Sequence, residues 1–354
     1  MPQDMTAEKV GSALSIRDAT VVRIMLIVIG SIALAAALWT ISDVLLLAFG
    51  AIILAILLRA ASAPLKRYLP VSDGAALAIA GLLLLLLLAG AGVIFGSQIT
   101  AQLSELSTQI PGAVQRIEQT LGVQDLLPQL RDQLSSSASS IFRNLTNFAF
   151  TATAAAANAV LLAIAGVFFA LKPRLYRDGF LLLFPRDKRG PIDKTLSHAG
   201  NALQQWLLGQ LISMTLVGVL MGLGLWIVGL PSPFALGLIA GLVEFVPLLG
   251  PIVGGVVPLL LAFGQGGTTV LWTLLVILIV QQIESNMIQP LVQRRMVSLP
   301  PALTLFSVLA FGALFGLPGL LLATPLTVVA FVAVKELYLR QTLGEPVSVP
   351  GEDK

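Results

Sequence analysis

Long apolar runs, separated by short polar stretches, make up most of the 354-residue chain. The uninterrupted runs cover residues 22–41, 44–58, 75–95, 148–171, 206–228 and 269–283. Because about 20 apolar residues form a helix that crosses a bilayer, these runs predict membrane helices. Two more apolar regions, 234–263 and 302–334, contain helix breakers. The pattern predicts an all-α polytopic membrane protein with about eight membrane segments, two of them interrupted, re-entrant-type helical hairpins.

The second run, residues 44–58, is short for a full crossing. Ser42 and Asp43 precede it and predict a tight turn, with Asp43 as the N-cap of the next helix. A helix of this length would need a tilt or a thinner bilayer to span the membrane.

The first interrupted region carries one carboxylate, Glu244, and many prolines. The prolines between residues 229 and 263 are Pro231, Pro233, Pro247, Pro251 and Pro258. Proline removes a backbone donor and clashes with the preceding turn, so no straight helix runs from Pro247 to Pro251. In hydrocarbon, a broken backbone persists only where it is buried in protein or lines a wet cavity. Interrupted segments of this kind point to a transporter's binding site, and Gly250 permits close backbone approach there.

The second interrupted region is longer than one crossing. It covers 302–334 and is broken by Gly316, Pro318 and Gly319, and again by Pro325. We therefore expect a second helical hairpin, with its turn at Gly316–Gly319.

Residues 97–147 differ from the rest in being rich in serine and glutamine. Apolar residues recur there at spacings of three or four, from Ile99 to Leu121, which is a heptad pattern interrupted by Pro111. The pattern fits an extramembrane helical element that contacts a neighbouring subunit, and equally a helical hairpin that packs on itself. The predicted divisions are 1–96 (three membrane helices), 97–147 (periplasmic insert), 148–171 (fourth helix), 172–205 (cytoplasmic amphipathic segment), 206–334 (transport core) and 335–354 (cytoplasmic tail).

The distribution of basic residues predicts the topology. Residues 172–205 carry seven lysines and arginines, and residues 59–74 carry three. Such segments stay in the cytoplasm, which places both termini there and 97–147 outside. Two oppositely directed re-entrant hairpins also put Arg294 and Arg295 inside, whereas eight full spans would put them outside. We favour the hairpins.

Composition narrows the function. The chain is 56% hydrophobic and only 11% charged, and its net charge of +3 is spread over many loops, so no nucleic-acid partner is expected. It contains no cysteine and a single histidine, His198, which we expect on the solvated surface. No Gly-Lys pair is present, which excludes a P-loop for ATP. We expect no enzyme activity, no metal site and no cofactor.

Glu244 and a later polar cluster are the candidate binding residues. An ionisable residue near the bilayer centre costs at least about 2.5–3.5 kcal/mol on insertion scales, which makes Glu244 a functional candidate for binding a cation or a proton. The alternative is a structural carboxylate that caps a half-helix N-terminus. The helix over 269–283 ends in polar residues, which include Gln281, Gln282, Glu284, Asn286 and Gln289, before Pro290. For Glu284 the alternative is a helix end that emerges among lipid headgroups.

Two blocks of the sequence resemble the autoinducer-2 exporter family of bacterial membrane proteins. The first block ends in VEFVPLLGPIVGG, in which Pro247, Gly250 and Pro251 match a Pro-x-x-Gly-Pro break. The second contains QQIESNMIQP and the later FGLPGLLLATP. The resemblance is specific over roughly residues 195–330, and the N-terminal half matches only in the order of its apolar segments.

The resemblance implies a helical transporter of the bacterial inner membrane that works without ATP and forms homo-oligomers. By position it assigns the site to Glu244, Pro247, Gly250, Pro251, Gln282, Glu284, Asn286 and Pro290. Family members are linked to export of autoinducer-2, and some relatives to sodium or lithium exchange for protons. The expected partners are therefore the lipid bilayer and a small polar solute, or else a monovalent cation and a proton. A scaffold that assembles through 97–147 without transporting anything is a third hypothesis.

Overall fold

The computed structural model describes residues 23, 25–34, 36–37, 39–68, 70–83, 86, 159–246, 249–290 and 299–352. Within these residues the chain is helical and contains no β-strand. It divides into two compact units, Met1–Leu47 and Ala48–Lys354. The predicted insert over 97–147, Pro247, and the pair Arg294 and Arg295 lie outside the described residues.

A single turn residue, Ile41, separates the first helical segment from α2 (Ser42–Tyr68), in which Ser42 and Asp43 are already helical. The amide of Ile41 donates to the carbonyl of Ala37 (3.1 Å), and the amide of Leu45 donates to that of Ile41 (3.0 Å). These are helical hydrogen bonds, so the prediction of a tight turn at Ser42 and Asp43 is wrong. At 27 residues, α2 is also long enough to cross a bilayer without the predicted adjustment.

Four described helices are long and apolar enough to cross a membrane. They cover Ser42–Lys66, Arg186–Val228, Gly267–Met287 and Pro301–Thr342. A fifth span results if Ala159–Leu171 and Pro173–Leu181, which meet at 86°, form one broken crossing. The described residues thus show a multi-pass helical protein with four or five spans, and the count of eight segments stays a prediction.

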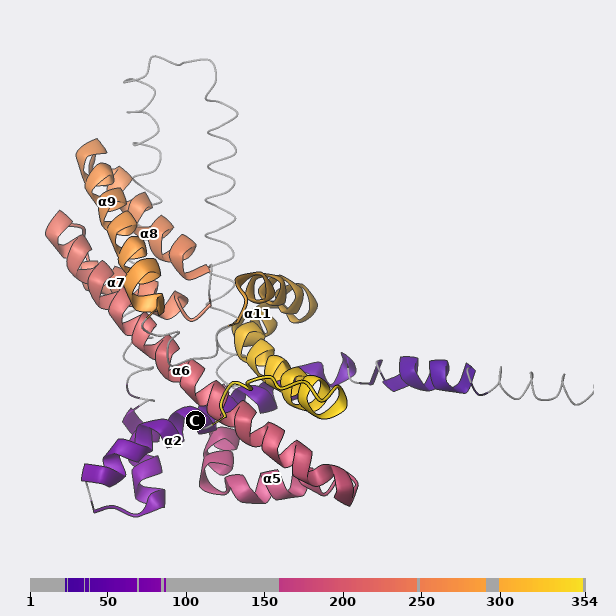
Figure 1. The fold of residues 1–354 in the computed structure, drawn as a ribbon. Coiled ribbons are helices and arrows are strands. Elements are labelled where there is room, and N and C mark those ends of the chain that lie inside the picture. The colour runs from indigo at the N-terminus through magenta and orange to yellow at the C-terminus, as the bar shows by residue number, and fades with distance from the viewer. Residues whose placement is uncertain are drawn as a thin grey trace, which may run out of the picture. The chain divides into compact units, whose positions relative to one another are not determined.

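Helix α6 (Arg186–Val228) is the longest element and follows α5 (Pro173–Leu181). Its 43 residues extend over about 65 Å, roughly twice the thickness of the hydrocarbon core. It therefore joins the second half of the basic segment 172–205 and the predicted span 206–228 in one rod (Figure 1). It ends at Gly229, whose φ of 83° lets the amides of Gly229 and Leu230 both donate to the carbonyl of Leu225.

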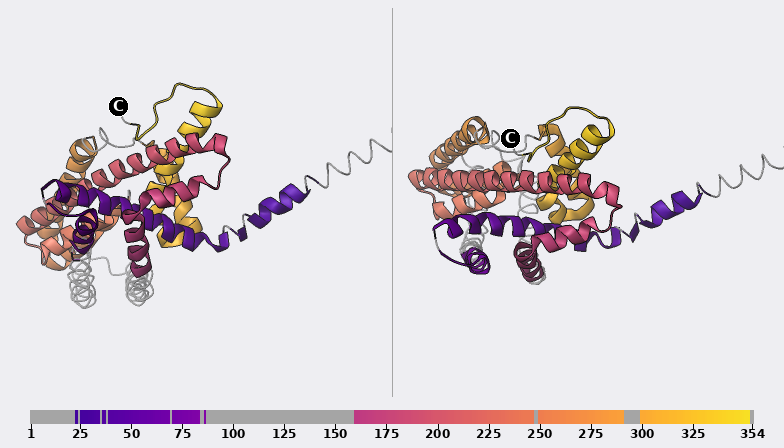
Figure 2. Two further views of the ribbon diagram at one scale, coloured as in Figure 1. Left: turned by 90° about the horizontal axis from the view of Figure 1, so that it is seen from below. Right: turned by 60° about the horizontal axis from the view of Figure 1, so that its bottom comes forward.

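Two hydrophobic cores lie along α6, one at each half. The C-terminal half buries Val217, Met221 and Leu225 against α7 (Pro233–Val243), α8 (Leu249–Gln265) and α9 (Gly267–Ile283). The N-terminal half packs against the second part of α11 (Pro301–Ala333) and the C-terminal segment. Its buried residues are Ala199, Ala202, Leu203, Trp206 and Leu207. Figure 2 shows α7 to α9 and α11 beside these different parts of α6.

Glycines bring the backbones of α6 and α7 into contact. A Cβ atom added to Gly237 would lie 2.7 Å from the Cα of Gly222, and one added to Gly241 would lie 3.1 Å from the Cα of Gly218. Each helix thus presents two glycines four residues apart to the other, the small-residue pattern of close helix pairs in membranes.

The predicted interruption of the first hairpin is present. Helix α7 ends at Val243 and α8 begins at Leu249, and the two pack against each other. Each is shorter than the roughly 20 residues of a crossing. Whether this hairpin is re-entrant stays a prediction.

The predicted break of the second hairpin is also present. Gly316 leaves the helical conformation (φ 63°, ψ −143°) within α11. Leu320 Cδ1 then lies 3.1 Å from where a Cβ of Gly312 would be, and a Cβ on Gly319 would lie against the carbonyl oxygen of Phe311. Residues eight apart in a straight helix would be about 12 Å apart, so the chain turns back on itself at Gly316.

His198 differs from its predicted solvated position. Its side chain is largely buried, and Nδ1 lies 3.3 Å from Oε2 of Glu336 on η2 (Val334–Thr342). The two residues are far apart in the sequence, so the sequence alone does not indicate that they pair.

Candidate functional site

Glu244 lies where α7 ends. Its amide still donates to the carbonyl of Ala240 (3.1 Å), and two further turns, Phe245 to Leu242 and Val246 to Val243, carry the chain toward α8. The residue is only 5% exposed. Its Oε2 lies beside Gly250, in the first turn of α8, so the alternative role as a cap for that half-helix stays a prediction. The interruption thus buries a carboxylate whose Oε2 has no hydrogen-bond partner.

Glu284 lies at the junction of α9 and the π-helical turn η1 (Glu284–Ile288). It is 4% exposed, and its Oε2 also lacks a hydrogen-bond partner. The interpretation of Glu284 as a solvated helix end is wrong, because the helix continues and the side chain is buried. The wider turn brings Gln289, five residues on, to the same side, where its Nε2 donates to Oε1 of Glu284 (3.4 Å). Single π-turns within helices occur frequently at functional sites.

Glu244 and Glu284 lie on elements that both pack on α6, and each has a buried Oε2 without a hydrogen-bond partner. No salt bridge joins either glutamate to any basic side chain that the structure describes. A buried charge is costly unless it is paired. The described part of the fold therefore buries two acidic groups without a cationic partner.

Gln210 on α6 contacts Glu244 and is not among the binding residues predicted from the sequence. Its Nε2 donates to the backbone carbonyl of Glu244 (2.6 Å), which fixes the end of α7 against α6. The signal that could have found it is a lone amide side chain within an apolar helix. Nearby, Trp206 and Phe245 form an edge-to-face ring contact (5.9 Å between centroids). Gln210 thus lies on α6 between the two hydrophobic cores, where polar groups replace apolar packing.

Gly250 and Pro251 lie in the first turn of α8. A Cβ on Gly250 would be 2.6 Å from the Cα of Glu244 and in contact with its Oε2, so only glycine fits beside this carboxylate. Pro251 is tolerated because the first helical turn has no carbonyl partner for its missing amide. The predicted closeness of Gly250 to the break is confirmed.

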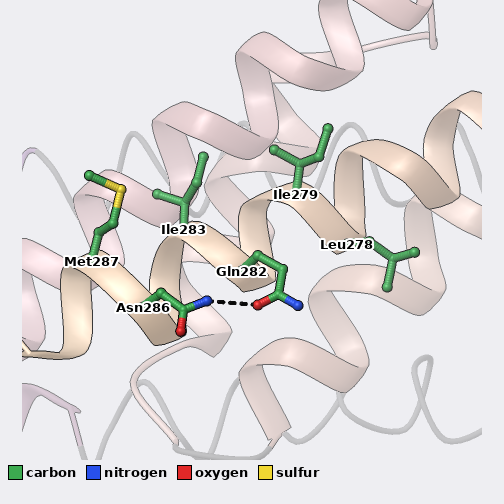
Figure 3. Close-up of a pocket in the computed structure, with 6 residues that line it drawn as sticks. All are labelled: Leu278, Ile279, Gln282, Ile283, Asn286 and Met287. Atoms are coloured by element: carbon green, nitrogen blue, oxygen red, sulfur yellow. Dashed lines mark hydrogen bonds between the residues drawn. The ribbon is translucent and has the colours of Figure 1, made fainter.

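The predicted polar cluster at the end of α9 is divided between two faces. Gln282 and Asn286 are exposed, and the Nδ2 of Asn286 donates to the Oε1 of Gln282 (2.8 Å). They line an open pocket of about 300 Å³ together with Leu278, Ile279, Ile283 and Met287 (Figure 3). Glu284 lies between them in sequence and points to the opposite, buried side. The structure therefore separates Gln282 and Asn286 from the buried glutamate.

The described contacts of the remaining predicted site residues lie within their own helix or hairpin. Gln281 is partly buried, and its carbonyl accepts the hydroxyl of Ser285 (2.8 Å), while Pro290 is exposed. Gly319 packs against Phe311 and Phe315 of its own hairpin, Pro325 is buried, and Gly316 and Pro318 are exposed at the turn. These contacts explain how the second hairpin folds, and a direct part for it in the site stays a prediction.

The chemistry of Glu244, Glu284 and the amides that contact them is that of oxygen-rich polar groups in apolar surroundings. No group of three or more His, Cys, Asp or Glu side chains that could hold a metal ion occurs among the described residues. The available groups are two carboxylates and two amides, from Glu244, Glu284, Gln210 and Gln289. Such groups bind protons, monovalent cations or the hydroxyls of a polar solute.

Comparison with known proteins identifies relatives that are described as candidate transport proteins. The candidate transport protein YrrI of Bacillus subtilis (strain 168) is 32% identical over 164 residues, which cover 46% of each chain. YueF of the same organism, described in the same way, is 25% identical over 64% of this chain and 58% of its own. The alignments thus span about half the length of these two relatives.

A longer match comes from Mycobacterium tuberculosis (strain CDC 1551 / Oshkosh). Its candidate transport protein MT0215 is 30% identical over 297 residues, which cover 77% of this chain and 78% of that protein. The sequence profile of the AI-2E family transporter matches residues 25–339, nearly the whole chain. The chain therefore belongs to the AI-2E family of transporters.

Proposed function

We propose that this chain is a secondary transporter that exports a small polar solute, such as autoinducer-2, across the bacterial inner membrane. The observation that carries the proposal is a buried carboxylate, Glu244, at the interruption between α7 and α8, whose backbone carbonyl accepts a hydrogen bond from the partly buried Gln210. A second buried carboxylate, Glu284, lies on η1, which also packs on α6. Interrupted helices with polar groups near the membrane midplane are the usual location of a transporter's site. The site residues expected from the sequence, with Gln210 added, form the proposed binding region.

The relatives support the same class of function. They are described as candidate transport proteins, and no Gly-Lys pair of a P-loop occurs in this sequence. An ion gradient is then the source of energy. The proposed orientation keeps both termini in the cytoplasm, following the basic residues of 172–205. The many exposed apolar side chains of α9 and α11 would contact lipid or a second copy of the chain.

Uptake into inverted membrane vesicles tests the proposal. Vesicles that contain the wild-type chain should accumulate labelled autoinducer-2 under an imposed ion gradient, and vesicles with Glu244→Gln should not. A matched control is Glu345→Gln, which alters an exposed glutamate of the C-terminal segment. Wild-type vesicles that accumulate no autoinducer-2 under any ion gradient would contradict the assigned solute.

A second candidate is exchange of sodium or lithium for protons, centred on Glu244. The favouring observation is that Glu244 is buried and forms no salt bridge with any described basic side chain. A proton signal in proteoliposomes after a sodium pulse, lost in Glu244→Gln, is the expected result. An unchanged signal in Glu244→Gln would remove Glu244 from the exchange site.

A further inference from the structure

We propose that the elbow formed by α5, the turn after it and the start of α6 (residues 172–189) is a binding site for anionic phospholipids at the membrane surface. In this arrangement α5 lies along the surface and its apolar side chains enter the boundary between headgroups and acyl chains. The basic side chains that flank it bind the headgroup phosphates. The inference goes beyond the proposed function, because it does not depend on what the chain transports.

A sharp bend sets the direction of α5. The apolar helix Ala159–Leu171 ends just before Lys172, and α5 leaves it at 86°. The rings of Phe169 and Tyr176 join the two helices across this bend in an edge-to-face contact, with 4.6 Å between ring centroids. Where the first helix runs across the bilayer, a helix at nearly a right angle to it runs along the membrane surface.

One side of the elbow is apolar and uncovered. Helix α5 has no buried residue. Leu175 is 62% exposed, and Leu182 and Leu183, in the turn that leads to α6, are 66% and 77% exposed. Phe180 is also exposed, although its ring contacts that of Phe184. Large apolar side chains are unfavourable in water and suit the boundary between headgroups and acyl chains.

The polar side of α5 faces α6. Arg177 lies three residues after Arg174, so both are on one side of the helix. The Nε of Arg177 donates to the Oδ1 of Asp193 on α6 (2.6 Å), and its Nη2 donates to the carbonyl of the same residue (3.0 Å). The Nε of Arg189 donates to the carbonyl of Phe184 (3.0 Å), which braces the turn. These bonds hold α5 with its apolar side away from α6.

The other basic residues of the elbow are free of such bonds. They are Lys172, Arg174, Arg186 and Lys188. All four are exposed, and none forms a salt bridge with a described acidic side chain. Two precede or begin α5 and two begin α6, so they flank the apolar side chains in the sequence. The exposed Asp178 and Asp187 offset only part of this charge.

The charge and the apolar side chains together identify the partner. Basic residues near a membrane surface attract acidic phospholipids, and arginine pairs especially well with phosphate. Free phosphate would meet the charge but would leave Leu182 and Leu183 uncovered. An anionic phospholipid supplies both a phosphate and acyl chains, and a transporter of this family is surrounded by lipid.

Site-specific fluorescence quenching in proteoliposomes tests the inference. The chain contains no cysteine, so Leu183→Cys introduces a single attachment point for a fluorophore. The full-length protein is reconstituted in phosphatidylcholine that contains a minority of phosphatidylglycerol. A nitroxide quencher near the top of the acyl chain is carried either by the phosphatidylglycerol or by an equal amount of the phosphatidylcholine. Quenching should be several-fold stronger when the phosphatidylglycerol carries it.

Two matched variants separate charge from insertion. Gln at all four free basic positions should reduce the quenching ratio of the two lipids to about one, while both lipids still quench, because the apolar side chains remain. Exchange of Lys for Arg and Arg for Lys at the same positions keeps the charge and should keep the ratio. Leu271→Cys, at an exposed position of α9 without a lysine or arginine nearby in the sequence, should show equal quenching in the wild-type background. Gel filtration checks that each variant is folded.

Salt provides a second readout on the same samples. At about 1 M salt the Debye length is about 3 Å, so the preference for phosphatidylglycerol should largely disappear while total quenching stays. Equal quenching by the two lipids at low salt, or a ratio unchanged in the four-Gln variant, would overturn the anionic ligand. No quenching by either lipid would overturn the inference as a whole and leave the apolar side of α5 to a soluble protein. Uptake of autoinducer-2 is measured separately, so the proposed function stands or fails independently.

Discussion

Two regions of this protein bury glutamates, and the described residues supply basic partners in one region and none in the other. Glu336, 2% exposed, lies within 3.1 Å of the Nη1 of Arg340 and within 3.3 Å of the Nδ1 of His198. Glu244 and Glu284 are also almost fully buried, yet no described basic side chain forms a salt bridge with either. Burial therefore does not distinguish these two kinds of carboxylate, whereas the basic partners around them do.

The region around Glu336 fastens the C-terminal segment to the rest of its unit. Arg340 also pairs with Glu352 (2.7 Å), the Nδ2 of Asn201 donates to the carbonyl of Gly351 (3.1 Å), and Val349 is buried in the core of α6 and α11. There Arg340 supplies the positive charge. Near Glu244 and Glu284 no described basic side chain does so.

The largest effect on stability should come from removing the cation beside Glu336. Arg340→Gln leaves Glu336 buried with a weaker set of partners, which should cost about 3 kcal/mol of folding free energy. The measurement is the apparent unfolding temperature of the purified protein in detergent. Arg174→Gln, at an exposed arginine of α5, should stay within about 0.5 kcal/mol of the wild type. Equal unfolding temperatures for the two variants would contradict the structural role of Arg340.

The same substitution at the two kinds of glutamate should have opposite signs. Glu336→Gln should lower stability by about 2 kcal/mol, because it weakens charge-assisted hydrogen bonds. Glu284→Gln should leave stability unchanged or raise it by about 1 kcal/mol in sodium-free buffer, because it removes a buried charge that has no described basic partner. Thermal unfolding in choline buffer measures both. A large loss of stability in Glu284→Gln would show that this carboxylate is structural.

A smaller effect is expected at the glycine beside Glu244. In Gly250→Ala the new methyl group would lie 2.6 Å from the Cα of Glu244, so the backbone must move, at a cost of about 1–2 kcal/mol. Uptake of autoinducer-2 into inverted vesicles should fall with it. Gly179→Ala is the matched control, because nothing lies within 4 Å of its added Cβ and α5 should gain slightly from alanine. Full uptake in Gly250→Ala would contradict the tight fit.

The smallest effect should appear in acid at the C-terminal segment. The hydrogen bond from Arg340 holds the pKa of Glu352 below its ordinary value of 4.5. A lowered pKa means that the contribution to stability is present above pH 4.5 and is lost as the pH falls through the lower folded value. Hydrogen exchange at Val349 should therefore rise in acid. In Glu352→Gln it should already be raised at neutral pH and change less on acidification.

Local chemistry explains which features could be predicted from the sequence. Proline and glycine disrupt a helix at their own position in the chain. The helix breaks near Pro247 and at Gly316 could therefore be predicted from the sequence. Hydrophobic runs likewise gave the helices, although α2 extended beyond its predicted end at residue 58 because its polar C-terminal turns carry no apolar signal.

Contacts between distant residues could not be read in the same way. Glu244 and Glu284 come from elements far apart in the sequence that both pack on α6. The π-turn at Glu284 changes which side chains share a face, so Gln289 contacts Glu284 while Gln282 and Asn286 face outward. His198 and Glu336 depend on the same long-range packing.

A double-mutant cycle on the uptake of autoinducer-2 into inverted vesicles tests the central claim most directly. If Glu244 and Glu284 belong to one binding region, Glu244→Gln and Glu284→Gln should each lower the rate of uptake by about 100-fold, equivalent to about 2.7 kcal/mol. The double variant should then be no slower than either single variant, since groups that act as a unit are not additive. Losses that multiply in the double variant, or wild-type uptake in either single variant, would contradict the single binding region.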